Sequence, residues 1–405
     1  MKSALIYLNV GESAKTGSLV YSQQYENARL IKEKNTEFDD VFAISVLPVK
    51  EFLKNNLKNK SSVIQWKNLT IHTYSTWIKI FKLSSFIFKD YLLNQSAKKI
   101  IKDLNSYSRV VFHCRSYYAA AQALAIKTIA PNIKVNIIFD MRSFLPEEIA
   151  MKSRQNKFFY LDYKAWEKEL IIQSDITFAT TQRGINIFKM TAPALTLTYL
   201  PNCGFEVIDK QEDLFERFDS IWKQQTFGYV GSVGPWYAPE KIELALDFFK
   251  LKINNSTTFI LNKKIKNIGQ HPAEYKPWKE VPNKIAGSLF TLIPGSSKSG
   301  YLSELKVTMN FFSTKAAESL SLGIPLVVNR DITEVAEFIE SNNCGIVFDI
   351  IDNKIVIAKE VEEQLNNKEF WQSLHKNTLI AGQKFKRQEI IKLLMSSYAS
   401  LSKTK

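Results

Sequence analysis

The stretch FFSTKAAESLSLGIPLVVN, residues 311–329, contains in order a polar turn, a helix pattern and a strand pattern. Ser313 and Thr314 are residue types that favour the N-terminal cap of a helix. Gly323 and the Ile-Pro-Leu-Val-Val run after it mark the return to an extended strand. The free N–H groups and positive dipole end of a helix N-terminus suit a phosphate. The stretch therefore predicts a helix-to-strand unit that begins with an anion-binding turn.

Lys315 and Glu318 lie about one turn apart in this predicted helix. A cation near a helix N-terminus is unfavourable by about 0.3–1 kcal/mol, so Lys315 is easier to explain if an anion lies beside it. Glu318 would then offer a carboxylate to vicinal hydroxyls, as acidic residues do for ribose in dinucleotide-binding folds. The alternative from spacing alone is an ordinary i,i+3 ion pair on a surface helix, worth a few tenths of a kcal/mol.

Short apolar runs alternate with longer amphipathic segments along the chain, which is the pattern of parallel strands joined by crossover helices. The runs that predict strands are residues 4–9, 41–46, 110–114, 134–141, 176–181, 226–231, 257–262, 287–294, 324–329 and 345–350. Helix patterns occupy 19–33, 116–128 and 158–173, and the last 40 residues resemble two helices broken at Gly382. The pattern predicts an α/β protein with doubly wound sheets.

The first series of strands ends near residue 200, and a polar stretch at 208–225 precedes the second series. We therefore predict an N-terminal domain over residues 1–200, a C-terminal domain over 201–385 and a final helix over 386–405. A chain of 405 residues is too long for one ordinary core and fits two domains. Because ligands bind at the carboxyl ends of strands in such sheets, two domains of this kind would face each other across a cleft.

The formal net charge of +14 favours a polyanionic partner, such as nucleic acid, anionic lipid or a phosphorylated substrate. A genome that uses many lysines explains it equally well, because the lysines are dispersed. No RNA-binding or helix-turn-helix signature accompanies the charge, so we expect no nucleic-acid partner. Cys114, Cys203 and Cys344 lie too far apart in the sequence to suggest a disulfide framework or a zinc site, and this favours a reducing compartment.

The N-terminal sequence MKSALIYLNVGES has too short an apolar stretch for a signal peptide, and no run approaches the roughly 18 apolar residues of a spanning helix. We expect a cytoplasmic protein that could act at the inner face of the membrane. Residues 77–93, WIKIFKLSSFIFKDYLL, combine basic and aromatic side chains that could rest on anionic lipid. A buried helix is the favoured alternative for this segment.

A second glycine-containing loop occurs in FGYVGSVGPWYAPEK, residues 227–241. Gly231 and Gly234 would let the backbone approach a ligand closely, and a helix entered through Pro239 carries Lys241. One such loop is weak evidence, because tight strand-to-helix turns need glycine in any case. The loop is significant because it is paired with the turn that contains Lys315. The two would lie at the carboxyl edge of the same sheet.

Polar residues also follow three strands of the first domain. The first loop, NVGESAKTGS at 9–18, contains Gly11 and Gly17. At or just beyond the ends of two more strands, 110–114 and 134–141, lie the polar residues His113, Arg115, Asp140, Arg142, Glu147 and Glu148. Such residues at strand ends are typical of an active-site rim. The alternatives are a hydrogen-bonded core histidine at position 113 and a structural ion pair between Asp140 and Arg142. The four histidines show no metal-ligand spacing, so no metal site is expected.

These segments together resemble family 4 of the GT-B glycosyltransferases. STKAAESLSLGIPLVVN resembles the family's donor-site segment, and YVGSVGPWYAPEK resembles the glycine-containing first loop of its second domain. LTYLPNCGFE is similar to its interdomain linker, and EKELIIQSDITFATT is similar to the segment before that linker. The matches follow the family's order from about residue 110 to 350. The resemblance implies two Rossmann-like domains facing across a cleft, with C-terminal helices packing back toward the N-terminal domain.

The resemblance also implies roles for particular residues. Lys241 and Lys315 would hold the diphosphate of a nucleotide sugar, and Glu318 would bind the ribose hydroxyls. The implied catalytic residues are His113, Lys241 and Lys315. The implied donor-binding residues are Gly11, Gly17, Gly231, Ser232, Asn310, Ser313, Thr314 and Glu318. The candidates on the acceptor side are Arg115, Asp140, Arg142 and Glu147.

The implied activity is transfer of a sugar from a nucleotide-sugar donor to a glycan or lipid-linked acceptor, in bacterial surface polysaccharide or glycoconjugate synthesis. The family is metal-independent and generally retains anomeric configuration, so the only cofactor-like molecule expected is the nucleotide sugar itself. Asn310 stands where the family often has a glutamate, and an arginine frequent after the first glycine of the second domain is missing. These departures favour the alternative, a noncatalytic GT-B-like protein that binds a nucleotide sugar or a partner enzyme.

Overall fold

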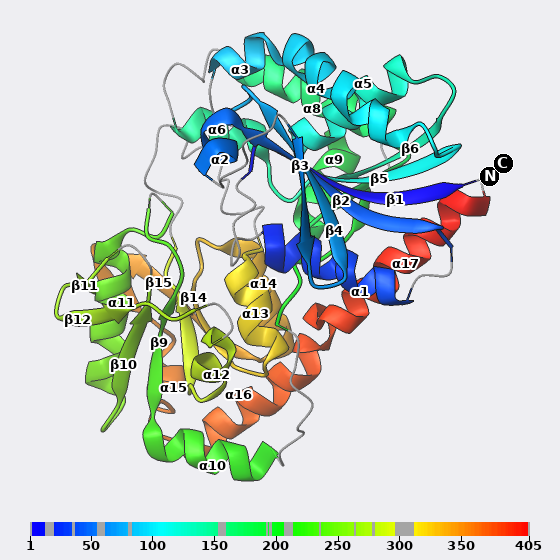
Figure 1. The fold of residues 1–405 in the computed structure, drawn as a ribbon. Coiled ribbons are helices and arrows are strands. Elements are labelled where there is room, and N and C mark those ends of the chain that lie inside the picture. The colour runs from blue at the N-terminus through cyan, green and yellow to red at the C-terminus, as the bar shows by residue number, and fades with distance from the viewer. Residues whose placement is uncertain are drawn as a thin grey trace. The chain divides into compact units, whose positions relative to one another are not determined.

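The computed structural model describes residues 2–12, 20–34, 37–54, 61–79, 83–152, 159–191, 193, 197–205, 214–234, 236–262, 265–277, 280–295 and 312–403. The chain divides into two compact units, one formed by residues 1–200 with 391–405 and the other by residues 201–390. Each unit contains one largely parallel sheet with helices on both faces (Figure 1). The doubly wound α/β organisation predicted from the sequence is therefore confirmed.

The sheet of the first unit has the strand order β3-β4-β2-β1-β5-β6-β7-β8. Its strands are β1 (Ser3–Val10), β2 (Asp40–Pro48), β3 (Ser61–Trp66), β4 (Leu69–Thr76), β5 (Arg109–Arg115), β6 (Lys134–Asp140), β7 (Ile176–Ala179) and β8 (Leu197–Tyr199). The β3–β4 pair is antiparallel, whereas β1, β2, β5, β6, β7 and β8 pair in parallel. The predicted strands of this half are present, whereas β3, β4 and β8 were not predicted.

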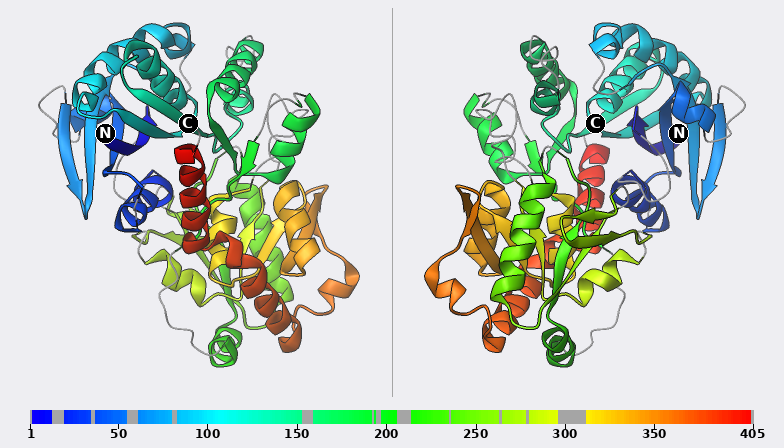
Figure 2. Two further views of the ribbon diagram at one scale, coloured as in Figure 1. Left: turned by 90° about the vertical axis from the view of Figure 1, so that its right-hand side faces the viewer. Right: turned by 90° about the vertical axis from the view of Figure 1, so that its left-hand side faces the viewer.

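Helices cover both faces of this sheet (Figure 1). They are the π-helix η1 (Tyr21–Tyr25), α1 (Glu26–Lys34), α2 (Val49–Lys54), α3 (Leu83–Ile87), α4 (Lys89–Leu104), α5 (Tyr117–Ile129), α6 (Leu145–Lys152), α8 (Tyr160–Gln173) and α9 (Gln182–Thr191). The end of α17 (Arg387–Lys403), red in Figure 2, also belongs to this unit. The Tyr398 hydroxyl lies 2.6 Å from that of Tyr7.

The sheet of the second unit has the strand order β11-β12-β10-β9-β13-β14-β15-β16. Its strands are β9 (Thr226–Val230), β10 (Thr257–Leu261), β11 (Asn267–Ile268), β12 (His271–Glu274), β13 (Phe290–Ile293), β14 (Leu326–Asn329), β15 (Gly345–Ile351) and β16 (Lys354–Val356). Its helices are α10 (Leu214–Gln224), α11 (Pro239–Lys252), α12 (Val281–Ala286), α13 (Thr314–Ser321), α14 (Thr333–Asn342), α15 (Lys359–Glu362), α16 (Lys368–Ala381) and the 3-10 helix η4 (Gly382–Phe385).

The helix-to-strand unit predicted for residues 311–329 forms as expected over its described part. Ser313 caps α13, and its side-chain oxygen accepts a hydrogen bond from the Ala316 N–H at 3.1 Å. The return to β14 passes through Gly323 at φ +74°, a left-handed conformation that glycine adopts without a steric penalty. The α13 helix is thereby fixed at the carboxyl edge of β9 and β13.

The break predicted at Gly382 is confirmed, because α16 ends at Ala381 and η4 begins at Gly382. A Cβ atom at Gly382 would lie only 1.9 Å from the Leu320 carbonyl oxygen. Glycine at this position therefore allows the end of α16 to approach α13 closely.

The segment 77–93 is not the single buried helix that was the favoured alternative. It contains α3 and the beginning of α4, with Ile78 and Phe86 buried but Trp77 72% exposed. Phe88 and Tyr91 are also exposed. The apolar residues of this segment thus divide between the core and the surface. Among the described helices, none has the length and apolarity required to cross a bilayer.

Candidate functional site

Lys315 lies in the first turn of α13, and its amine points toward two tyrosines of the neighbouring chain segment. The Nζ atom is 2.7 Å from the Tyr229 hydroxyl and 3.3 Å from the centre of the Tyr237 ring. It also lies 4.6 Å from the centre of the Tyr229 ring. The contacts described for this amine are therefore with aromatic groups rather than with a carboxylate.

Gly231 makes room for the Lys315 side chain. A Cβ atom at Gly231 would lie 2.2 Å from Lys315 Cε and 2.9 Å from Nζ, and the backbone has φ +129°. Both the space and the backbone conformation therefore require glycine. The glycine expected to admit a ligand is in direct contact with the lysine expected to bind that ligand.

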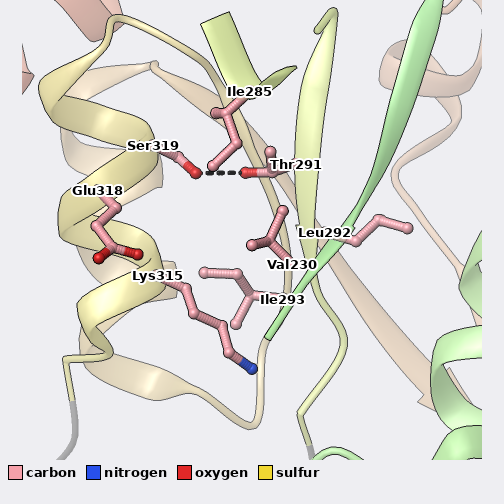
Figure 3. Close-up of a pocket in the computed structure, with 8 residues that line it drawn as sticks. All are labelled: Val230, Ile285, Thr291, Leu292, Ile293, Lys315, Glu318 and Ser319. Atoms are coloured by element: carbon pink, nitrogen blue, oxygen red, sulfur yellow. Dashed lines mark hydrogen bonds between the residues drawn. The ribbon is translucent and has the colours of Figure 1, made fainter. Parts of the chain in front are cut away.

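The ionisation of Lys315 reflects this environment. The residue keeps part of its surface exposed, but its amine end lies against the two tyrosines. Burial lowers the pKa of Lys315 to about 7, although the Glu318 carboxylate partly opposes this effect. The Lys315 amine and the Glu318 carboxylate point in different directions (Figure 3). Lys315 is therefore poised to change charge near neutral pH, unlike an ordinary surface lysine.

A small pocket lies beside Lys315 and Glu318. Its remaining lining residues are Val230, Ile285, Thr291, Leu292, Ile293 and Ser319 (Figure 3). Thr291 and Ser319 share a hydrogen bond of 2.7 Å between their hydroxyl groups. The pocket volume of about 10 Å³ is enough for about one water molecule. A phosphate would therefore have to lie outside this pocket, or the Lys315 side chain would have to move toward it.

The other predicted donor residues lie in different places. The Ser232 carbonyl accepts a hydrogen bond from the Tyr229 hydroxyl at 2.5 Å, so Ser232 belongs to the Lys315 surroundings. Lys241 instead donates to the Asn353 side chain at 3.0 Å, in the turn between β15 and β16. It is not among the residues that line the Lys315 pocket. Asn310 and Gly17 lie outside the described residues.

In the first unit, His113 is at the centre of a buried hydrogen-bond network. Its Nε2 atom lies 3.2 Å from Asp140 Oδ2, and its Nδ1 atom lies 2.9 Å from the Tyr398 hydroxyl. The Tyr398 hydroxyl also lies 2.6 Å from that of Tyr7, whose ring stacks on the imidazole at 4.7 Å. His113 is 2% exposed. Both ring nitrogens are engaged, as in the hydrogen-bonded core histidine considered above.

Charges in this network compensate one another. Burial lowers the pKa of His113, although the Asp140 hydrogen bond opposes the effect. Burial also disfavours the Asp140 carboxylate, but the Arg142 guanidinium and the His113 hydrogen bond outweigh burial and lower its pKa to about 2. The Arg142 Nε atom lies 2.7 Å from Asp140 Oδ2. The network therefore contains a neutral imidazole and a buried ion pair.

The remaining acceptor-side candidates have partners of their own. Arg115 Nε lies 3.1 Å from Glu12 Oε2, and Glu147 lies 3.1 Å from both the Lys164 amine and the Tyr160 hydroxyl. Gly11 forms a turn at φ +80°. Glu147 thus belongs to a cluster on α6 and α8, separate from the hydrogen bonds described for His113.

Strained backbone occurs where β5 and β6 end. Ser116 has φ +67° and Arg142 has φ +43°, values that residues other than glycine rarely adopt. Such conformations are concentrated at functional sites, because the surrounding structure must stabilise them. Their position supports the expectation that this edge of the sheet has a function.

Four tyrosines that the structure brings to these sites were not predicted from the sequence. Tyr229 and Tyr237 lie in the quoted glycine loop, so their spacing around Gly231 was an available signal. No sequence signal could link Tyr7 with Tyr398, because 391 positions separate them in the sequence.

Comparison with known proteins gives a fold but no close relative. No protein-family model matches the chain, and no curated protein matches it by sequence. Among solved structures, sucrose-phosphate synthase from Thermosynechococcus elongatus has 13% identity and a TM-score of 0.68 over 100% of both chains. The α,α-trehalose 6-phosphate synthase from Burkholderia multivorans has 9% identity and a TM-score of 0.60, covering 99% of this chain and 97% of that one.

A third similar structure, assigned as a UDP-N-acetylglucosamine 2-epimerase from Listeria monocytogenes, has 12% identity and a TM-score of 0.57. The match covers 100% of this chain and 98% of that one. At such low identities the likeness establishes the fold, while the reaction must be argued from the site. The chain therefore has the GT-B fold, built from two doubly wound Rossmann-like units.

Proposed function

We propose that this protein is a glycosyltransferase that transfers a sugar from a nucleotide-sugar donor to an acceptor carrying a hydroxyl group. The observation that carries the proposal is Lys315, a lysine desolvated against tyrosines at the N-terminus of α13. Burying an amine without a carboxylate partner costs stability. No carboxylate pairs with the Lys315 amine among the described residues, and a diphosphate would supply a negative charge at the edge of the sheet where ligands of doubly wound folds bind.

Within this proposal, Lys315 binds the donor diphosphate, the backbone around Ser313 and Thr314 assists it, and Glu318 accepts hydrogen bonds from the ribose hydroxyls. Gly231 and Ser232 form the adjacent loop. The positive charge would stabilise the leaving phosphate in place of a divalent metal ion. We therefore expect transfer to continue in the presence of EDTA and to retain the anomeric configuration.

Lys241 and His113 have less direct parts in the proposal. Lys241 would have to leave Asn353 in order to reach the diphosphate. His113 would act by holding the end of β5 in place, since both of its ring nitrogens already have partners. Substitution of Lys241 should therefore weaken donor binding less than substitution of Lys315.

For the acceptor, we propose a sugar, glycan or lipid-linked sugar bound at the carboxyl edge of β5 and β6, near Arg115 and Arg142. The strained residues at this edge support the assignment. The names of two neighbours, which are synthases of sugar phosphates, support a carbohydrate acceptor. Synthesis of a bacterial surface polysaccharide is the context we propose, and cosedimentation with anionic vesicles would test contact through Trp77 and Tyr91, both exposed.

The proposal is tested by thermal denaturation with UDP, GDP, ADP, CMP and their sugars. A ligand at about 100 times its dissociation constant should stabilise the fold by roughly 2.7 kcal/mol. We expect one nucleotide to stabilise the wild type, and Lys315→Ala and Glu318→Ala to lose that effect. Lys384→Ala is the matched control, because Lys384 lies 4.2 Å from the centre of the Phe338 ring in the same unit but does not line the pocket beside Lys315. A folded wild type that no nucleotide stabilises would contradict the proposal.

Two other functions have specific support and are separated by product analysis. Asn310, in place of the family's usual glutamate, favours a protein that binds a nucleotide sugar without transferring it. The epimerase among the fold neighbours favours a reaction in which the sugar stays on its nucleotide. Chromatography of the nucleotide sugar after incubation with acceptors distinguishes the three. Released nucleoside diphosphate indicates transfer, an altered nucleotide sugar indicates epimerisation, and an unchanged one indicates binding alone.

A further inference from the structure

The surroundings of the Lys315 amine are built from groups that the proposed transfer reaction does not itself require. The Tyr229 hydroxyl donates to the Ser232 carbonyl at 2.5 Å, so its lone pairs face the Lys315 amine 2.7 Å away. The Tyr237 ring lies on another side of the amine, with its centre 3.3 Å from Nζ. Gly231 leaves the space that the lysine stem occupies. The amine is thereby fixed in one position.

Among the residues that the structure describes, few charged or titratable groups lie around this amine. On its own helix, Glu318 is the group that favours the charged form. From the other described elements, Tyr229 on β9 and Tyr237 in the loop before α11 face the amine. Burial raises the pKa of both tyrosines, so they remain neutral. The residues of β13 and α12 that line the adjoining pocket, Thr291 and Ile285 among them, carry no charge.

We propose that Tyr229 and Tyr237 are positioning residues that hold the Lys315 amine at the edge of the donor site and deliver it to the donor diphosphate. Tyr229 fixes the amine through its hydroxyl, and Tyr237 limits the access of water through its ring. The inference rests on the proposed function, because it assigns the diphosphate as the anion that receives the amine. It adds two residues that the resemblance to glycosyltransferases did not indicate.

Proton uptake on binding follows from this arrangement. A diphosphate stabilises the ammonium form, so the pKa of Lys315 is higher in the complex than the value of about 7 in the free protein. Binding below pH 7 then needs no extra proton, whereas binding above pH 7 takes one up. The dissociation constant should rise by up to about tenfold per pH unit above pH 7, until the pKa of the complex is reached.

The direct test is the pKa of Lys315 in the full-length protein, measured by NMR of isotope-labelled lysine side chains. The Lys315 signal is identified by its absence in Lys315→Met. In the wild type we expect the Lys315 signal to titrate near pH 7, well below the usual value of a lysine amine. Tyr237→Ala should raise the Lys315 pKa by at least one unit because it admits water. Tyr229→Phe should lower it, because the ammonium loses its hydrogen-bond acceptor.

The same samples are then titrated with UDP and with inorganic pyrophosphate. We expect either probe to raise the Lys315 pKa. Calorimetry at pH 8, in two buffers of different ionisation enthalpy, should then report that binding takes up close to one proton. If Lys315 titrates near the usual lysine value of about 10.4, or if both tyrosine variants leave its pKa unchanged, the inference is overturned whatever the nucleotide does. If the pKa is low but neither probe raises it, the proposed function fails, and delivery to a diphosphate fails with it.

Discussion

The two units each bury a polar cluster at the carboxyl edge of their sheet, but the clusters are balanced differently. In the first unit, His113, Asp140 and Arg142 compensate one another, and the Tyr398 hydroxyl occupies the remaining imidazole nitrogen. In the second unit, the contacts described for the Lys315 amine are with tyrosines. The balanced cluster has the chemistry of a structural support. We propose that the second cluster, whose described contacts include no carboxylate, is completed by a bound anion.

Among the substitutions that test this difference between the two clusters, Lys315→Met should have the largest effect. We expect it to weaken nucleotide binding at least about 100-fold and to raise the free energy of unfolding by about 1–3 kcal/mol at pH 7, because it removes a costly buried amine and keeps a side chain of similar length. Calorimetric titration and urea denaturation measure the two effects. Lys384→Met, near Phe338, is the control for replacing a lysine that lies on an aromatic ring. Destabilisation by Lys315→Met would assign Lys315 a structural role.

Gly231→Ala should destabilise the second unit by about 2–3 kcal/mol, because its backbone has φ +129° and its new methyl group would overlap the Lys315 stem. Part of this cost should disappear in the Gly231→Ala, Lys315→Met double variant, where the stem can move. A double-mutant cycle by urea denaturation measures the coupling. Strict additivity of the two substitutions would show that Lys315 does not occupy the space above Gly231.

Tyr398→Phe should cost about 1–2 kcal/mol of stability, because it leaves His113 Nδ1 and the Tyr7 hydroxyl without the partner they share. Nucleotide binding should remain within about twofold of the wild type, since the network lies in the other unit. Tyr91→Phe, at an exposed position, is the matched control. A loss of nucleotide binding in Tyr398→Phe with unchanged stability would contradict the supporting role of this network.

The smallest but most specific effect is expected in the pH dependence of the free energy of unfolding. The two clusters should contribute to it in different pH ranges. The folded-state pKa of Lys315 is about 7, below the unfolded value near 10.5, so stability should rise with pH between these values. The folded-state pKa of His113 is also lowered, so stability should fall as pH drops below the unfolded value near 6.5. Each slope is at most about 1.4 kcal/mol per pH unit. Urea denaturation of Lys315→Met should show a smaller rise in stability between pH 7 and 10.5 than the wild type shows, with the acidic slope unchanged.

Strands buried on both faces could be predicted because continuous apolar runs directly report burial. The runs at 4–9, 110–114 and 324–329 all became strands. β3 and β4 were missed because they form an antiparallel pair at the edge of the sheet, where apolar and polar residues are mixed. β8 is only three residues long. Edge strands depend on their partners, and a window of sequence does not contain those partners.

In the candidate site, too, features that depend on neighbouring residues could be predicted, and contacts between distant residues could not. The Ser313 cap, the α13 helix and the nearby lysine could be predicted, because a helix start depends on residues within one turn. The contact of Lys241 with Asn353 could not, since 112 positions separate the two residues. The hydrogen bond between His113 and Tyr398 spans 285 positions. Such pairings arise only when strands and helices distant in the chain pack together.

By itself, the sequence determined two doubly wound units, a capped helix that suits a phosphate, and the glycines at the turns of Gly231 and Gly323, because local sterics and hydrophobic periodicity act over a few residues. Only the tertiary structure decided which polar groups became partners. It placed two tyrosines against Lys315 and compensating charges around His113. The reason is physical: the cost of burying a charge depends on everything within a few ångströms, and that neighbourhood is assembled from the whole chain.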